Sequence, residues 1–134
     1  MNKNNSIDLG PLDQLMRDPS ITEVMVNGHT KIFIETRGTL KSTPLSFNSE
    51  ADLLKLFQSI ALSLGKTLDE KNPTLDGRLP DGSRVNIVIP PVAVDGPSLT
   101  IRKFSPFVMS LEQLMGYGMF DERMAYFLNC CVSA

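Results

Sequence analysis

Two arginines stand on either side of a tight turn near the middle of the chain. Pro80-Asp81-Gly82-Ser83 is a turn sequence, because proline fixes φ and glycine adopts the positive φ at which the chain can reverse. Arg78 precedes the turn and Arg84 follows it. If the flanking segments pair as strands, the two guanidinium groups lie near one another.

A third segment brings two more cations to the same end of the predicted sheet. After the connection at Val92-Ala93-Val94-Asp95, the pattern of Ser98 to Phe104 predicts a strand that runs back antiparallel to the second. This pairing places Arg102 and Lys103 beside Arg84. The register stays open, since a slip of one residue exchanges the two faces of a strand, but the clustering at one end survives such a slip.

The cation cluster has two interpretations. Guanidinium groups bind phosphate through paired N–H donors, so gathered arginines indicate an anionic ligand. Asp76, Asp81 and Asp95 lie in the same region, however, and can neutralise the arginines as ordinary surface ion pairs. Residue types and spacing alone favour the ion pairs.

Positioning these residues requires an α+β domain, an antiparallel sheet with helices packed on one face. Strand and turn signals alternate with helical periodicity and capping residues along the chain. The elements expected, in order, are a short helix opening at Gly10-Pro11 and ending at Asp18-Pro19, strands over Thr22 to Asn27, Lys31 to Thr36 and Thr39 to Lys41, a long helix from Ser49 to Gly65, the three arginine-bearing strands, and helices starting at Ser110 and Asp121.

Composition fits one soluble domain. The 134 residues suffice for a sizeable core, and residues 1–7 are polar enough to be disordered. No signal peptide or membrane span is indicated. The net charge of −2 disfavours a general nucleic-acid binder. With one histidine and two adjacent cysteines, Cys130 and Cys131, the sequence predicts neither a metal site nor a disulfide framework.

The arginine-bearing stretch resembles the N-terminal domain of the secretion (traffic) ATPases, which power type II and type IV secretion and pilus assembly. The resemblance rests on Leu75 to Asn86, on Pro90-Pro91 and on Gly96 to Phe104, and it is supported by Asp18 to Gly28 and by Ile60 to Leu68. It covers about residues 12–134. Among these enzymes the chain is most similar to the tight-adherence, or Flp pilus, branch (CpaF-type).

The resemblance implies a PAS-like α+β fold and a nucleotide-sensing, subunit-contacting role within a homohexamer. Arg84 in Gly-Ser-Arg-Val and Arg102 in Thr-Ile-Arg-Lys match the family's phosphate-contacting positions best, and Arg78 matches less securely. ATP and Mg²⁺ would belong to the full-length parent rather than to this chain. The implied partners are the protein's own C-terminal ATPase domain, neighbouring subunits and the pilus or secretion machinery, at the cytoplasmic face of the inner membrane.

The chain itself carries no Walker A loop. The pattern Gly-x-x-x-x-Gly-Lys-Ser/Thr, which holds nucleotide phosphates, does not occur in it. Gly65-Lys66-Thr67 has the last three letters, but Ile60 stands at the first glycine position and the segment closes a helix rather than opening one. We therefore expect residues 1–134 to be an isolated N-terminal domain without ATPase activity of its own.

Two other functions stay open. PAS-like sheets also serve as small-ligand-binding sensory modules, which need a cavity lined by convergent polar groups. The sequence identifies no such groups, and a filled core accounts for Phe33, Phe47, Phe57 and Phe104. A nucleic-acid module would need aromatic residues interleaved with the arginines and a basic overall charge, both of which are lacking.

Overall fold

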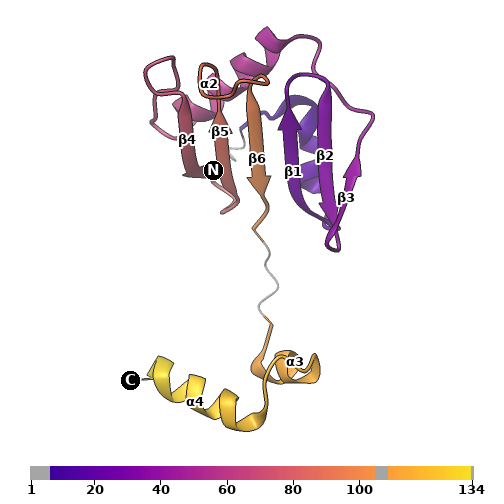
Figure 1. The fold of residues 1–134 in the computed structure, drawn as a ribbon, viewed down its shortest axis with the longest axis vertical. Helices are drawn as coiled ribbons and strands as arrows, with labels where there is room; N and C mark the ends of the chain where they lie inside the picture. The colour runs from indigo at the N-terminus through magenta and orange to yellow at the C-terminus, as the bar shows by residue number, and fades with distance from the viewer. Residues whose placement is uncertain (1–6, 105–108, 134) are drawn as a thin grey trace, which may run out of the picture. The chain divides into compact units, whose positions relative to one another are not determined.

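A computed structural model describes residues 7–104 and 109–133 of the chain. It divides after Phe104 into two compact units (Figure 1), where a single domain over residues 1–134 is expected from the sequence. Of the N-terminal segment 1–7, only Ile7 lies within the described residues, and it packs against the core. The expectation of disorder for residues 1–6 lies outside the described residues.

The first unit is built on one antiparallel sheet of six strands, which confirms the predicted α+β class. The order across the sheet is β3-β2-β1-β6-β5-β4, so two three-stranded meanders meet where β1 pairs with β6 (Figure 1). The strands are β1 (Ile21–Asn27), β2 (Lys31–Thr36), β3 (Thr39–Ser42), β4 (Thr74–Arg78), β5 (Arg84–Val88) and β6 (Ser98–Arg102).

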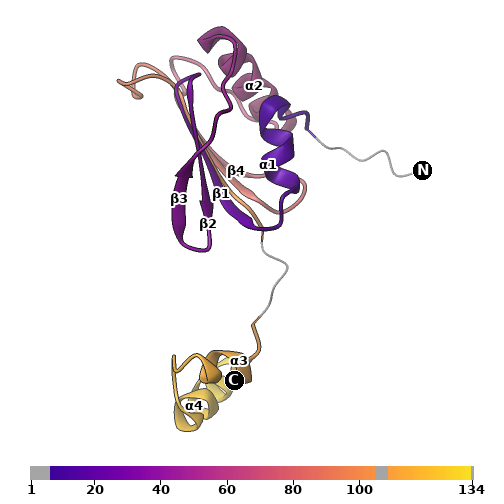
Figure 2. The ribbon, with the colours of Figure 1, turned by 90° about the vertical axis from the view of Figure 1, so that its right-hand side faces the viewer.

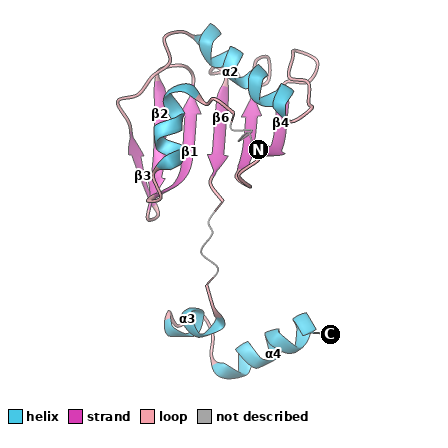
Figure 3. Cartoon of the chain, turned by 180° about the vertical axis from the view of Figure 1, so that it is seen from behind, coloured by secondary structure: helices cyan, strands magenta, loops and turns pink. Residues whose placement is uncertain are grey.

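Helices cover one face of this sheet. The short 3₁₀ segment η1 (Gly10–Leu12) leads into α1 (Asp13–Arg17), and α2 (Glu50–Ser63) follows β3. Both α1 and α2 lie on the same side of the strands (Figures 2 and 3). The Ser49 side chain accepts a hydrogen bond from the Asp52 amide and begins α2, and Gly65 follows its end at φ +65°. The predicted bounds of this helix are therefore confirmed.

The core lies between the helices and the sheet. Every second residue of the central strands is buried, as strand geometry requires for a sheet with one covered face. Complete burial of one such aliphatic side chain stabilises the fold by about 1.5–3 kcal/mol. The fully buried side chains include Val24, Val26, Ile32, Leu53, Phe57, Ile60, Val85, Ile87 and Ile101.

Two phenylalanines expected in the core are not there. Phe33 is only partly buried and faces the opposite side of β2 from the buried Ile32. Phe104 is 59% exposed and lies against Gly82, where a Cβ atom in place of the glycine hydrogen would stand 3.2 Å from the ring. The uncovered face of the sheet therefore carries apolar as well as polar side chains.

The second unit is a helix pair. Its helices are α3 (Leu111–Gly116) and α4 (Glu122–Ser133). A capping box begins α3, since the Gln113 amide donates to the Ser110 hydroxyl and the Ser110 amide donates to the Gln113 side chain. Within the described part of this unit, Ala125 is the one buried residue of α4, and Met124, Phe127, Leu128 and Val132 are exposed.

Between residues 7 and 133, omitting 105–108, no helix combines the length and the apolar character needed to span a bilayer.

Candidate functional site

The three predicted arginines form one row across neighbouring strands. Arg78 on β4 is the Cα partner of Arg84 on β5, and Arg84 is in turn the partner of Arg102 on β6. Directly paired residues point to the same face of a sheet. All three side chains are exposed and belong to the face that the helices leave uncovered. The predicted clustering of the arginines is confirmed, and the register that the sequence left open is now defined.

Lys103 does not join this row. As the next residue after Arg102 it turns to the opposite face, where its Nζ donates to the main-chain carbonyl oxygens of Asp18, at 2.5 Å, and Leu15, at 3.4 Å. Burial lowers the pKa of Lys103, although Asp18 and Asp81 partly oppose this effect. The sequence-based expectation that Lys103 lies beside Arg84 is therefore wrong, because alternation along the strand sends it to the end of α1.

The turn between β4 and β5 is anchored by Ser83. Its amide and hydroxyl donate to the two carboxylate oxygens of Asp81 at 2.9 and 2.8 Å, and its hydroxyl accepts from the Phe104 amide at 3.1 Å. Ser83 is buried, with 1% of its surface exposed. These contacts join the turn that precedes Arg84 to the segment that follows Arg102, so they hold the two arginine-bearing strand ends together.

Carboxylates flank the central arginines on their outer sides. Asp76 on β4 accepts two hydrogen bonds from Arg84, from Nε at 3.1 Å and from Nη2 at 2.7 Å. Glu23 on β1, the Cα partner of Arg102, lies 3.6 Å from its Nη2. The hydrogen bond from Arg84 holds the pKa of Asp76 below its usual range. The ion-pair interpretation is therefore correct for Arg84, whereas Arg102 pairs with a residue that the sequence did not indicate.

A shallow hollow of about 230 Å³ lies between these groups. Asn86 and Thr100 are Cα partners one row further along the same face, and they also line it. The lining thus offers guanidinium, amide and hydroxyl donors, a set that suits a tetrahedral oxyanion. The residues that line the hollow are Glu23, Asp76, Arg84, Asn86, Thr100 and Arg102.

Sequence reasoning missed three of these residues. The two-residue period of a strand leads from Arg84 to Asn86 and from Arg102 back to Thr100, so the signal for both was present. Glu23 enters only through the pairing of β1 with β6, which joins segments far apart in the sequence. No local pattern indicates such a pairing.

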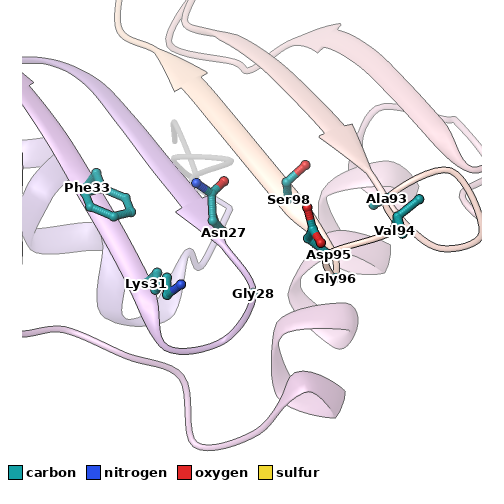
Figure 4. A pocket seen from close by; sticks show the side chains of 9 residues that line it. All are labelled: Asn27, Gly28, Lys31, Phe33, Ala93, Val94, Asp95, Gly96 and Ser98. Atoms are coloured by element: carbon teal, nitrogen blue, oxygen red, sulfur yellow. The ribbon is translucent and has the colours of Figure 1, made fainter.

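A second hollow lies at the other end of the sheet. It measures about 740 Å³ and is lined by residues from the β1–β2 hairpin and the β5–β6 connection (Figure 4). Lys31, Asp95 and Ser98 supply polar groups, and Phe33 and Val94 supply apolar surface. Asp95 therefore lies with this second hollow, and not among the residues that line the hollow at the arginines.

Among residues 7–104 and 109–133, no group of three or more His, Cys, Asp or Glu side chains is arranged to hold a metal ion. Cys130 and Cys131 are free and exposed on α4.

The fold and the sequence define a class of protein. Residues 5–134 match the family described as Type II/IV secretion system protein, and the chain belongs to this family. The resemblance to secretion ATPases is thereby confirmed at the level of the family.

Individual relatives agree with this assignment. The chain is 34% identical over 97% of its length to an uncharacterized protein of Methanocaldococcus jannaschii, of which it covers 24%. It is 34% identical over 84% of its length to the type IV secretion system protein VirB11 of Bartonella quintana, of which it covers 32%. A solved structure, the VirB11 ATPase of the Brucella suis type IV secretion system in complex with sulphate, superimposes with a TM-score of 0.71 at 32% identity, over 84% of this chain and 34% of that one. The chain thus spans 24% of the Methanocaldococcus jannaschii protein and 32% of the Bartonella quintana VirB11 protein.

Proposed function

We propose that this chain is the phosphate-contacting N-terminal part of a secretion ATPase, in which Arg84 and Arg102 bind one nucleotide phosphate between them. A single observation carries the proposal. Arg84 and Arg102 are Cα partners on adjacent strands, on the uncovered face, and they line the same hollow.

Electrostatics supports an anion at this position. Like charges directly opposite one another on neighbouring strands destabilise a sheet. The two flanking carboxylates lie on the outer sides of the pair, toward β4 and β1, so they do not separate the guanidinium groups. A phosphate placed between the arginines would accept hydrogen bonds from both and would offset their repulsion.

The sulphate named with the Brucella suis VirB11 structure is consistent with this chemistry, since sulfate and phosphate are both tetrahedral oxyanions. In an ATPase, two fixed cations at the phosphate would stabilise negative charge as the phosphoryl group transfers. Arg78 belongs to the same row but not to the lining of the hollow, so we assign it a long-range electrostatic role.

The remaining parts of such an enzyme lie outside this chain. The relatives are about three to four times as long as the stretch they share with it. We propose that the phosphate cradle, the Mg²⁺ site and most nucleotide contacts come from a P-loop domain of a longer parent protein, which acts as a homohexamer at the cytoplasmic face of the inner membrane. The sequence motifs favour the Flp pilus branch for that parent.

A small-ligand function is the alternative, and the hollow in Figure 4 is where it would reside. Its polar groups come from two separate segments, and none of its lining residues is an arginine. Lys31 is the cation there, which makes it a useful control for the phosphate site.

Titration with inorganic phosphate at constant ionic strength tests the proposal. Amide resonances of β5 and β6 should shift on addition of phosphate in an NMR experiment on the 134-residue chain. Arg84→Ala and Arg102→Ala should each weaken binding by about tenfold or more, because each removes a charge-assisted contact. Lys31→Gln removes the same charge at the other end of the sheet and should leave the affinity unchanged. Equal weakening by all three substitutions would mean that phosphate responds only to net charge.

A further inference from the structure

We propose that Asp76 is a positioning residue. Its carboxylate takes the position on Arg84 that a phosphate would take, and Arg84 must leave Asp76 when phosphate binds. The inference rests on the phosphate site proposed above and adds a component to it. Asp76 would set the affinity of that site and would select for anions that carry more than one negative charge.

The contact between Asp76 and Arg84 copies the way an arginine binds phosphate. Both carboxylate oxygens are engaged, one by Nε at 3.1 Å and the other by Nη2 at 2.7 Å. This edge of the guanidinium group presents two parallel N–H donors, which is the arrangement that also suits two phosphate oxygens. While Asp76 occupies the edge, the same donors are not available to a ligand.

The direction of the contact matters as much as its geometry. Asp76 lies on β4 and pairs directly with Asn86, so its bond to Arg84 runs diagonally across the sheet. The bond draws Arg84 toward β4, whereas Arg102 lies on the other side, on β6. A ligand that binds both arginines and uses these same two N–H donors of Arg84 therefore requires Arg84 to leave Asp76.

Glu23 holds Arg102 much less firmly. The Oε2 atom of Glu23 is 3.6 Å from Nη2 of Arg102, and no hydrogen bond joins these two described side chains. The two carboxylates are thus unequal, and Asp76 is the one whose contact must be exchanged.

The Asp76 pair is weak enough to be exchanged. The side chains of Arg84 and Asp76 are 66% and 50% exposed, so water screens their attraction. A phosphate dianion offers twice the charge of a carboxylate and contacts Arg102 at the same time. A monoanion offers Arg84 no more charge than Asp76 already does, so the pair disfavours it.

Asp76→Asn is the direct test, because it keeps the shape of the side chain and removes its charge. We expect the variant to bind inorganic phosphate about two- to fivefold more tightly than the unaltered chain in the NMR titration, which is the range that an exposed ion pair spans. Glu35→Gln is the control, because this substitution removes the same charge. Glu35 is the Cα partner of Glu23 and lies on the same face of the sheet. The control substitution should change the affinity much less.

Combining each substitution with Arg84→Gln separates a specific contact from general charge. If Asp76 acts by holding Arg84, its effect disappears in the Arg84→Gln background. Tighter binding that persists there, or an equal gain from Glu35→Gln, overturns the inference. The inference about Asp76 is also overturned if Asp76→Asn leaves phosphate affinity unchanged or lowers it. If phosphate binding still requires Arg84 in that case, the proposed function stands. Phosphate binding that does not depend on Arg84 removes the proposed function itself.

Discussion

At the scale of single residues, the candidate site is a pair of arginines on β5 and β6 with one carboxylate contact on each outer side. Asp76, Arg84, Arg102 and Glu23 follow one another from β4 to β1, with the two cations in the middle. Arg84 and Arg102 each contact a carboxylate on the outer side and face each other on the inner side, and Arg78 is the Cα partner of Arg84 on β4. This arrangement stores unfavourable repulsion at one point, which is where an anion gains most from binding.

The pKa of Asp76 provides a measurable consequence. Its depression arises chiefly from the Arg84 hydrogen bond, with smaller attractions from the Arg84 and Lys66 charges and an opposing effect of burial. Arg84→Gln should therefore raise the pKa of Asp76 toward the ordinary range for a carboxyl group. The carboxyl carbon shift followed by NMR against pH reports this value for each variant.

Asp69 supplies the internal reference for that titration. Its pKa is lowered by hydrogen bonds from Asn72, not by an arginine, so it should not respond to Arg84→Gln. A lowered carboxylate pKa stabilises the fold above the unfolded value, and this stabilisation is lost as the pH falls through the folded value. The unaltered chain should accordingly lose the contribution of Asp76 at lower pH than the variant does. An unchanged Asp76 titration would mean that the pair does not persist in solution.

At the scale of elements, local signals are sufficient for most of the first unit. Turn residues, strand alternation and the capping signature before α2 each act over a few residues, so they predict both meanders and the long helix. What they cannot predict is the junction of β1 with β6, because that contact joins segments far apart in the sequence. For this reason the sequence does not indicate Glu23 as a site residue. Phe33 is wrongly expected in the core because the sequence does not determine which face of β2 its side chain occupies.

The buried Ser83 side chain gives a prediction about the stability of the β4–β5 turn. Ser83→Ala removes the acceptor for the Phe104 amide and the donor to Asp81 in a buried position, so it should lower the free energy of unfolding by about 1–3 kcal/mol. Urea denaturation measures the change. Ser42→Ala, at an exposed position on β3, should change stability by no more than about 0.5 kcal/mol.

The same variant tests how the turn supports the site. Loss of the link between the β4–β5 turn and the end of β6 should also loosen the pairing of Arg84 with Arg102. Phosphate affinity should therefore fall in Ser83→Ala, although no atom of the hollow's lining has been altered. Full stability and full affinity in this variant would show that the turn is held by other contacts.

At the scale of the whole molecule, the two units differ in how they bury apolar surface. The first has a closed core between sheet and helices, whereas most large apolar side chains on the described part of α4 are exposed. A helical period reports which residues share a face, and it carries no information on what packs against that face.

ATP hydrolysis belongs, in our proposal, to a longer parent protein, and we expect none from this chain alone. The 134 residues contain arginines but no Gly-x-x-x-x-Gly-Lys-Ser/Thr loop, and cations without a phosphate cradle provide only part of the stabilisation that phosphoryl transfer requires. A phosphate-release assay on the purified chain should therefore show no turnover of ATP above background. ATP turnover that co-purifies with the chain and disappears in Arg84→Ala would refute this assignment.

The most direct test of the central claim is the position of a single anion relative to Arg84 and Arg102. Crystals of the chain grown with selenate, whose anomalous scattering locates a tetrahedral oxyanion unambiguously, provide that measurement. We predict one selenate over Asn86 and Thr100, within hydrogen-bonding distance, about 2.7–2.9 Å, of both guanidinium groups, with Arg84 released from Asp76. Selenate bound at the hollow that contains Lys31, or Arg84 still joined to Asp76 with selenate touching only one arginine, would contradict the shared phosphate site.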